Sequence, residues 1–128
     1  MGVYGNFLTE LDWSVGEILN TLDEKGWAED TLLIFTSDNG GAHYIGLPDI
    51  NQPYRGWKAT FFEGGTHVPF FMKWPKEISA GTIYDKPISH TDIFPTAAVA
   101  AGLTVPVYGT LDGVDLVPYV SGADSGTP

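Results

Sequence analysis

Apolar residues at the start of the chain recur every three or four positions, which is the spacing of one face of an α-helix. Charged and polar side chains fall mostly between them. The pattern predicts a helix that begins close to Met1 and ends at Gly26, because glycine readily adopts the positive φ of the residue just beyond a helix. The apolar positions that define this face are Tyr4, Leu8, Leu11, Val15, Ile18 and Leu22.

The next apolar segment is short and continuous. Residues 31–36 read Thr-Leu-Leu-Ile-Phe-Thr, which is typical of a strand covered on both faces, as in a parallel sheet. A helix, a short loop and a buried strand in succession indicate an α/β fold. We therefore predict an α/β fold with a mostly parallel sheet flanked by helices.

Two further apolar segments and a second helical pattern follow. Residues 68–74 are predicted to form a strand, and residues 83–88 a short edge strand. A helix is then expected to start at an N-cap, either Ser89 or Thr91, and to end at Gly102.

Charge and composition exclude several classes of function. Six basic against 16 acidic residues give a net charge of -10, so no nucleic-acid partner is expected on bulk electrostatics. No apolar run approaches the ~18 residues of a membrane-spanning helix, so no membrane partner is expected either. The absence of cysteine excludes disulfides, thiolate metal ligands and a cysteine nucleophile.

Asp38 and Asn39 follow the first predicted strand directly. Ligands of open α/β sheets gather at the carboxyl ends of strands. A carboxylate and an amide carbonyl are hard oxygen donors that suit Ca²⁺ or Mg²⁺. The sequence Asp-Asn-Gly-Gly is equally suited to a turn closed by its own side chains, so both interpretations stay open here.

Residues 42–66 are predicted to form a long irregular loop, and loops of this length are often functional. Arg55 and Lys58 make a local positive spot there, which is either an anion contact or a pair of solvated charges. Glu63 is expected to pair with one of these two cations and hold the loop. The two glycines after Glu63 permit either a close backbone approach or a bulge.

The three histidines match no zinc-binding spacing. His43 follows the Asp-Asn pair closely and is the foremost candidate to reach a ligand. His67 precedes a predicted strand and His90 a predicted helix, where hydrogen bonds to backbone groups are expected. Asp92 lies in the first turn of that helix, where the helix dipole accounts for it.

Short motifs along the chain resemble, in order and spacing, the later part of the catalytic domain of type I sulfatases in the alkaline phosphatase superfamily. The resemblance covers roughly residues 4–122. It implies a partial three-layer sulfatase core, with residues 1–122 as the C-terminal portion of the catalytic domain and residues 123–128 as a flexible tail. The motifs are TLLIFTSDNG at 31–40, RGWKAT at 55–60, EGGTHVP at 63–69, WP at 74–75, SHTDIFPT at 89–96 and LDG at 111–113.

The resemblance also implies roles for particular residues. Asp38 and Asn39 match two Ca²⁺ ligands of that family. Lys58 matches the lysine that contacts the sulfate group and stabilises charge near the leaving oxygen, and Arg55 lies in the same loop. The resemblance carries over none of the three histidines, but His43 joins Lys58 and Arg55 in the expected substrate-binding set because of its place after the Asp-Asn pair. Related phosphodiesterases and phosphonate hydrolases typically have Asp-His instead, so Asn39 favours Ca²⁺ and sulfate esters.

Other parts of the family pattern are absent from this sequence. It lacks the short cysteine or serine motif that is oxidised to formylglycine, and it lacks the paired aspartates that complete the Ca²⁺ shell. We therefore expect a fragment without the N-terminal half of the domain, inactive alone and binding Ca²⁺ weakly or not at all. By resemblance, the full-length protein is expected to be periplasmic or secreted.

Two alternatives remain at this point. The chain is a free-standing module that binds an anion or a partner through the retained loop, or a fragment of a phosphodiesterase or phosphonate monoester hydrolase. In every case a sheet cut in this way exposes strand edges and apolar faces. We therefore expect the chain to associate with itself or to need its missing half.

Overall fold

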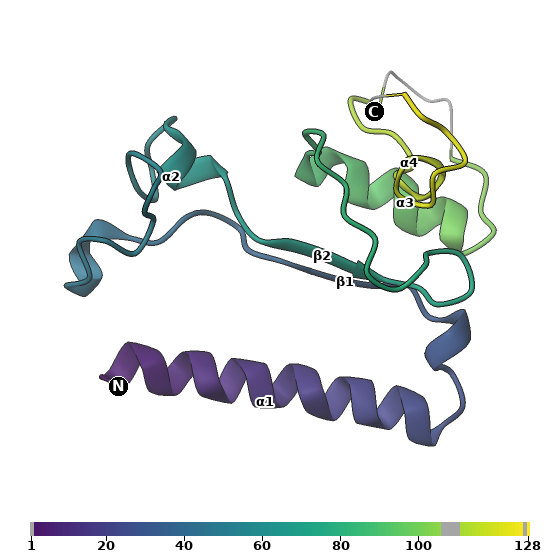
Figure 1. The fold of residues 1–128 in the computed structure, drawn as a ribbon, viewed down its shortest axis with the longest axis horizontal. Helices are drawn as coiled ribbons and strands as arrows, with labels where there is room; N and C mark the ends of the chain where they lie inside the picture. The colour runs from purple at the N-terminus through teal and green to yellow at the C-terminus, as the bar shows by residue number, and fades with distance from the viewer. Residues whose placement is uncertain (1, 106–110, 127) are drawn as a thin grey trace. The chain divides into compact units, whose positions relative to one another are not determined.

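The computed structural model describes residues 2–105, 111–126 and 128 (Figure 1). The chain divides into two units, one comprising residues 1–25 and 33–72 and the other residues 26–32 and 73–128. The helices are α1 (Val3–Glu24), α2 (Glu63–Thr66), α3 (Ile93–Ala100) and α4 (Val117–Val120). The 3₁₀ turns are η1 (Ala28–Asp30), η2 (His43–Ile45) and η3 (His90–Asp92), and the strands are β1 (Leu33–Thr36) and β2 (Phe70–Lys73).

The long helix α1 confirms the predicted helical periodicity. It ends before Gly26, which has the expected positive φ of 70°, while Met1 lies outside the described residues. None of its residues is buried, so its apolar face is largely uncovered in this chain. Within the described residues, no helix is long and apolar enough to cross a membrane.

The sheet differs from the predicted one. The strands predicted at residues 31–36 and 68–74 form, as β1 and β2, and they pair with each other in antiparallel orientation (Figure 1). The expected mostly parallel sheet is therefore not confirmed within this chain. The physical reason is the connection: residues 37–69 contain no long crossover helix, and parallel neighbours need such a crossover whereas antiparallel neighbours do not.

The predicted edge strand at residues 83–88 is wrong, because this segment has no strand structure. Ile83 is 92% exposed, so its apolar side chain does not lie on a covered sheet face. Pro87 also lacks the backbone N–H that a ladder requires. The apolar residues here misled the interpretation because a short apolar run alone does not identify a strand.

The predicted N-cap Ser89 is confirmed, although it caps the 3₁₀ turn η3, which leads directly into α3. The Ser89 hydroxyl accepts from the Thr91 N–H at 3.3 Å, and Asp92 accepts from the Ser89 N–H at 2.7 Å, which forms a capping box. Asp92 is only 6% exposed and also accepts from the Val114 N–H at 3.0 Å. The helix dipole alone is therefore an incomplete account of Asp92, which joins two segments of the chain.

Thr96 extends this connection one turn further along α3. Its hydroxyl donates to the Asp92 carbonyl at 2.6 Å and accepts from the Leu116 N–H at 2.9 Å, and both Thr96 and Leu116 are fully buried. A side chain at Gly113 would overlap the Thr91 carbonyl oxygen. We call residues 89–96 and 113–116 the helix-cap cluster, which contains the fully buried side chains of Thr96 and Leu116.

Candidate functional site

The segment after β1 is a turn closed by its own polar groups. The Ser37 hydroxyl donates to the Asn39 carbonyl at 3.0 Å, and the Asn39 side-chain amide donates to the Gly40 carbonyl at 2.9 Å. Asp38 is exposed, and no described residue bonds to its carboxylate. The segment is thus a bend held by local side-chain bonds, but among the described residues it lacks the bond from an Asp or Asn side-chain oxygen to a backbone N–H that an Asx-turn has. The side-chain oxygens of Asp38 and Asn39 are available to a ligand.

Glycines let the loop approach this turn closely. The Gly40 N–H donates to the Gly65 carbonyl at 3.0 Å, and the Gly64 N–H donates to the Arg55 carbonyl at 2.8 Å. A side chain at Gly40 would overlap the Gly64 carbonyl oxygen, and one at Gly64 would overlap the Gly56 carbonyl oxygen. The glycines after Glu63 therefore serve a close backbone approach, which was one of the two predicted alternatives.

Asn51 joins the turn to the cationic loop, and the sequence analysis missed it. Its side-chain oxygen accepts from the Gly41 N–H at 2.8 Å, and its amide donates to the carbonyls of Gly41 at 2.9 Å and Gly56 at 3.0 Å. The Lys58 N–H also donates to the Gly41 carbonyl, at 3.1 Å. Nothing in the sequence separates Asn51 from other polar loop residues, because its partners are backbone groups of distant segments.

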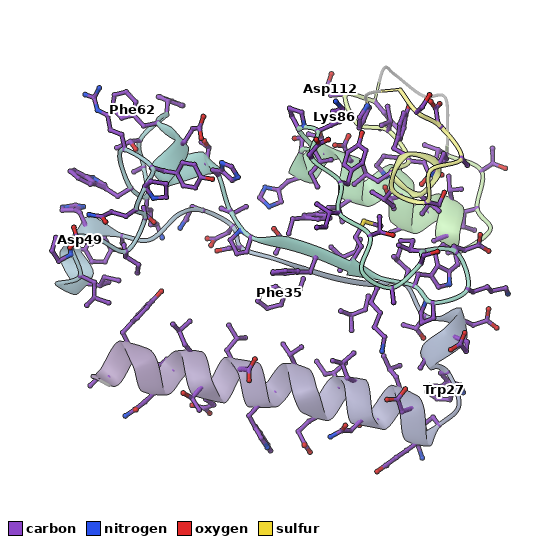
Figure 2. The ribbon with its side chains drawn as sticks, in the orientation of Figure 1. Trp27, Phe35, Asp49, Phe62, Lys86 and Asp112 are labelled. Atoms are coloured by element: carbon purple, nitrogen blue, oxygen red, sulfur yellow. The ribbon has the colours of Figure 1, made fainter. Side chains whose placement is uncertain are left out.

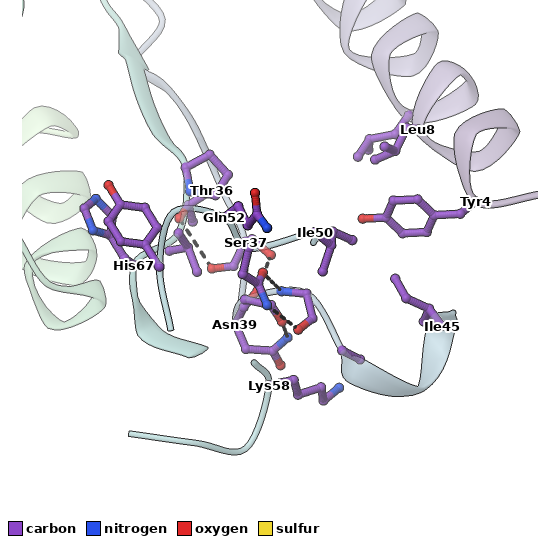
Figure 3. A pocket seen from close by; sticks show the side chains of 18 of the residues that line it. Tyr4, Leu8, Thr36, Ser37, Asn39, Ile45, Ile50, Gln52, Lys58 and His67 are labelled. Atoms are coloured by element: carbon purple, nitrogen blue, oxygen red, sulfur yellow. Dashed lines mark hydrogen bonds between the residues drawn. The ribbon is translucent and has the colours of Figure 1, made fainter. Parts of the chain in front are cut away.

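A hollow of about 740 Å³ lies beside the turn (Figure 3). Asn39 and Lys58 both line it, so two of the predicted site residues border the same hollow. The Lys58 ammonium forms no ion pair within the described part of the chain. The rest of the lining is largely apolar or aromatic and includes Tyr4, Leu8, Ile50 and Tyr54.

Three predicted site residues do not line this hollow: Asp38, Arg55 and His43. The Arg55 guanidinium lies 4.0 Å from the ring centre of Phe62, a cation–π contact. Phe62 is labelled in Figure 2. The His43 ring packs against Trp57 with 5.3 Å between ring centres. Aromatic neighbours therefore hold Arg55 and His43, and their roles toward a substrate stay predictions.

Glu63 does not pair with Arg55 or Lys58 as expected. Its carboxylate lies 3.2 Å from Nδ1 of His67, because the helical turn α2 brings residues four apart onto one face. The His67 ring also stacks on Tyr54, with 4.3 Å between ring centres. The expectation that His67 bonds to the backbone is thus wrong for its side chain, which bonds to a carboxylate.

The donor set fits a hard cation only in part. Asp38 and Asn39 offer a carboxylate and an amide oxygen, which is Ca²⁺-type chemistry. Among the described residues, no three His, Cys, Asp or Glu side chains gather closely enough to hold a metal ion. Because Ca²⁺ takes six to eight oxygen ligands, this chain supplies a minority of a complete shell.

Comparison with known proteins identifies the family. The sulfatase family model matches residues 1–103. Over 94% of its length the chain is 47% identical to human steryl-sulfatase, and over 92% it is 40% identical to the uncharacterized sulfatase YdeN of Escherichia coli. It spans only 22% and 21% of these two relatives, respectively.

Solved structures agree with the sequence relatives. The fold matches the PsFucS1 sulfatase from Pseudoalteromonas sp. with a TM-score of 0.78 and 38% identity, covering 92% of this chain and 24% of that one. It matches Ps i-CgsB, solved with a neocarrahexaose, with a TM-score of 0.76 and 35% identity, covering 84% of this chain and 24% of that one. This confirms the resemblance found in the motifs. The chain belongs to the sulfatase family.

Proposed function

We propose that this chain is the part of a sulfuric ester hydrolase that supplies two Ca²⁺ ligands, Asp38 and Asn39, and a sulfate-contacting lysine, Lys58. The observation that carries the proposal is the shared hollow, which Asn39 and Lys58 line together at the end of β1. Family membership supports the reaction class. The substrate class is accordingly a sulfate ester.

Lys58 has the properties of an anion contact. Its ammonium is without an ion-pair partner among the described residues, while its backbone N–H is bonded to Gly41 beside the Asn39 turn. An ammonium without an ion-pair partner, on a backbone that is bonded beside the turn, can form a charge-assisted hydrogen bond to a sulfate oxygen. As charge develops on the leaving oxygen during hydrolysis, the same group stabilises it.

Asp38 and Asn39 are the cation ligands in this proposal. The hydrogen bonds that hold the turn are made by the Ser37 hydroxyl and the Asn39 amide hydrogens. A metal ion could therefore bind the side-chain oxygens of Asp38 and Asn39 without breaking these bonds. When bound, Ca²⁺ would neutralise negative charge on the sulfate oxygens. Two ligands give weak binding, since full extracellular sites reach only ~10⁻⁴–10⁻³ M.

The proposal assigns the chain to a larger assembly of the same domain. The apolar face of α1 has no buried residue, and the sheet has two strands in the described part of the chain. In the whole protein the two strands join a larger, mostly parallel sheet, and α1 packs in one of the helical layers of a three-layer core. The formylglycine nucleophile comes from outside this chain, which has no cysteine and no serine in the required motif.

Titration calorimetry on the 128-residue chain, with sodium sulfate and with calcium chloride, tests both assignments. Lys58→Ala is expected to lower sulfate affinity about tenfold or more, as loss of one charged hydrogen bond does, while Lys86→Ala is the matched control. Asp38→Asn is expected to remove calcium binding, with Asp12→Asn on α1 as its control.

Activity provides a separate readout on 4-nitrophenyl sulfate. The chain alone is expected to show no hydrolysis above the Lys58→Ala background, because it lacks the nucleophile. Hydrolysis that depends on Lys58 would contradict the prediction that the chain alone is inactive. Equal sulfate affinities of the unmodified chain and Lys58→Ala would overturn the assignment of the lysine. Tighter binding of methyl phosphate than of methyl sulfate would favour the phosphoester relatives.

A further inference from the structure

Another polar group borders the hollow, and the sulfatase resemblance assigns it no role. His67 lines the hollow together with Lys58 and Asn39. Two contacts hold its imidazole ring: the Glu63 carboxylate at Nδ1, 3.2 Å away, and the stacked Tyr54 ring at 4.3 Å. A ring held at its edge and on one face has a defined orientation.

The carboxylate also selects the tautomer of the ring. An ionised carboxylate can only accept a hydrogen bond, so the hydrogen of His67 lies on Nδ1. In the neutral imidazole Nε2 is then the nitrogen without a hydrogen, and it acts as an acceptor. No described residue donates to Nε2, so this acceptor is available to a ligand.

Backbone contacts bring His67 close to the proposed sulfate site. Gly40 is bonded to Gly65, two residues before His67, and Gly41 is bonded to Lys58. The Asn39 turn therefore lies between the segments that carry the lysine and the histidine (Figure 3). A molecule bound to Lys58 in the hollow has His67 on the same lining surface.

We propose that His67 is a further substrate-binding residue, whose Nε2 accepts a hydrogen bond from a hydroxyl group on the alcohol part of the sulfate ester. The inference rests on the proposed function, in which Lys58 binds the sulfate group. Glu63 is a positioning residue that acts through His67, and Tyr54 holds the plane of the ring. The substrate class is thus narrowed to sulfate esters of hydroxylated alcohols.

Binding of two sulfate esters to the 128-residue chain tests this inference. Glucose 6-sulfate carries hydroxyl groups on its alcohol part, and hexyl sulfate carries none. His67→Phe keeps an aromatic ring beside Tyr54 but removes Nε2, and it should weaken glucose 6-sulfate binding about three- to tenfold, the usual range for one neutral hydrogen bond. Hexyl sulfate binding should be unchanged. His67→Gln, which retains an acceptor, should restore part of the loss, and His90→Phe is the matched control.

The two proposals fail in distinguishable ways. If Lys58→Ala weakens both esters but His67→Phe weakens neither, the lysine stands and the histidine assignment is wrong. If neither ester depends on Lys58, the proposed function itself is wrong. Equal losses of both esters in His67→Phe would point to a structural role and also overturn this inference.

Nitrogen-15 NMR of the imidazole provides a test that needs no ligand. The neutral ring of His67 should carry its hydrogen on Nδ1 in the unmodified chain. Glu63→Ala should shift the population toward the Nε2–H form, and Glu63→Gln, whose side-chain oxygen still accepts, should preserve the original tautomer. A hydrogen on Nε2 in the unmodified chain would overturn the proposal.

Discussion

The helix-cap cluster and the loop around the Asn39 turn are built from similar parts but leave their polar groups in opposite states. Both contain an aspartate, a small hydroxyl side chain and a glycine with no room for a Cβ atom. In the cluster, Asp92 and Thr96 are buried and bonded to backbone N–H groups. In the loop, Asp38 is exposed and no described residue bonds to its carboxylate.

This difference separates motif residues whose polar groups are satisfied inside the protein from motif residues whose charged groups stay available to a ligand. A buried carboxylate must be satisfied inside the protein, because leaving it unpaired is strongly destabilising. An exposed carboxylate or ammonium is satisfied by water and can exchange that water for a ligand. Of three family motifs, SHTDIFPT therefore stabilises the fold, whereas SDNG and RGWKAT keep the charged groups of Asp38 and Lys58 available.

Two substitutions share the largest expected effect on stability, and the first of them is in the glycine packing of the loop. Gly64→Ala would force a methyl group into the Gly56 carbonyl and within 2.7 Å of the Arg55 carbonyl. Because both contacts are backbone, the loop must shift, and we expect a loss of about 1–3 kcal/mol in the free energy of unfolding. Urea denaturation measures it.

Gly16→Ala is the matched control for that change. No atom lies within 4 Å of a Cβ at Gly16, and the residue is inside α1, so the substitution should stabilise the chain by about 0.5–1 kcal/mol. Equal effects of Gly64→Ala and Gly16→Ala would mean that the close backbone approach in the loop does not matter for stability.

The comparison between the two regions is tested most directly by paired aspartate substitutions. Asp92→Asn replaces an acceptor oxygen with an N–H₂ group facing a backbone donor, either Ser89 or Val114. We expect it to lower the free energy of unfolding by about 1–3 kcal/mol. Asp38→Asn should leave stability unchanged, and urea denaturation measures both variants. A reversed order would contradict the division into structural and chemical residues.

The smallest expected effect concerns an exposed ion pair in the unit that holds the cluster. The hydrogen bond from Lys76 to Asp30, with its charge attraction, raises the pKa of Lys76 above its ordinary value of 10.5. A raised folded pKa gives a stabilisation that is present below pH 10.5 and is lost as the pH rises through the folded value.

Lys76→Met keeps much of the side-chain stem and removes the charge. Its urea midpoint should lie slightly below that of the unmodified chain at neutral pH, and the two should converge at strongly alkaline pH or in high salt, because exposed pairs are screened. A difference that persists in high salt would mean that packing of the stem, and not the ion pair, is responsible.

Local rules within the sequence determined the elements whose causes lie within a few residues. The period of α1, the apolar run of β1 and the hydroxyl of Ser89 each predicted a feature that the structure contains. The ordered motifs also identified the family. In each case the signal and its physical cause are neighbours along the chain, so periodicity and capping chemistry are enough to detect them.

Tertiary structure alone decided the contacts between distant segments. The antiparallel pairing of β1 with β2, the bonds of Asn51 to two loops, and the link from Asp92 to Val114 join residues from 5 to more than 20 positions apart. The pairing of Glu63 with His67, in contrast, is a local contact four residues apart on the helical turn α2, which the sequence analysis did not predict. Backbone carbonyls and N–H groups occur at nearly every residue, so only the folded path of the chain selects which of them a side chain meets.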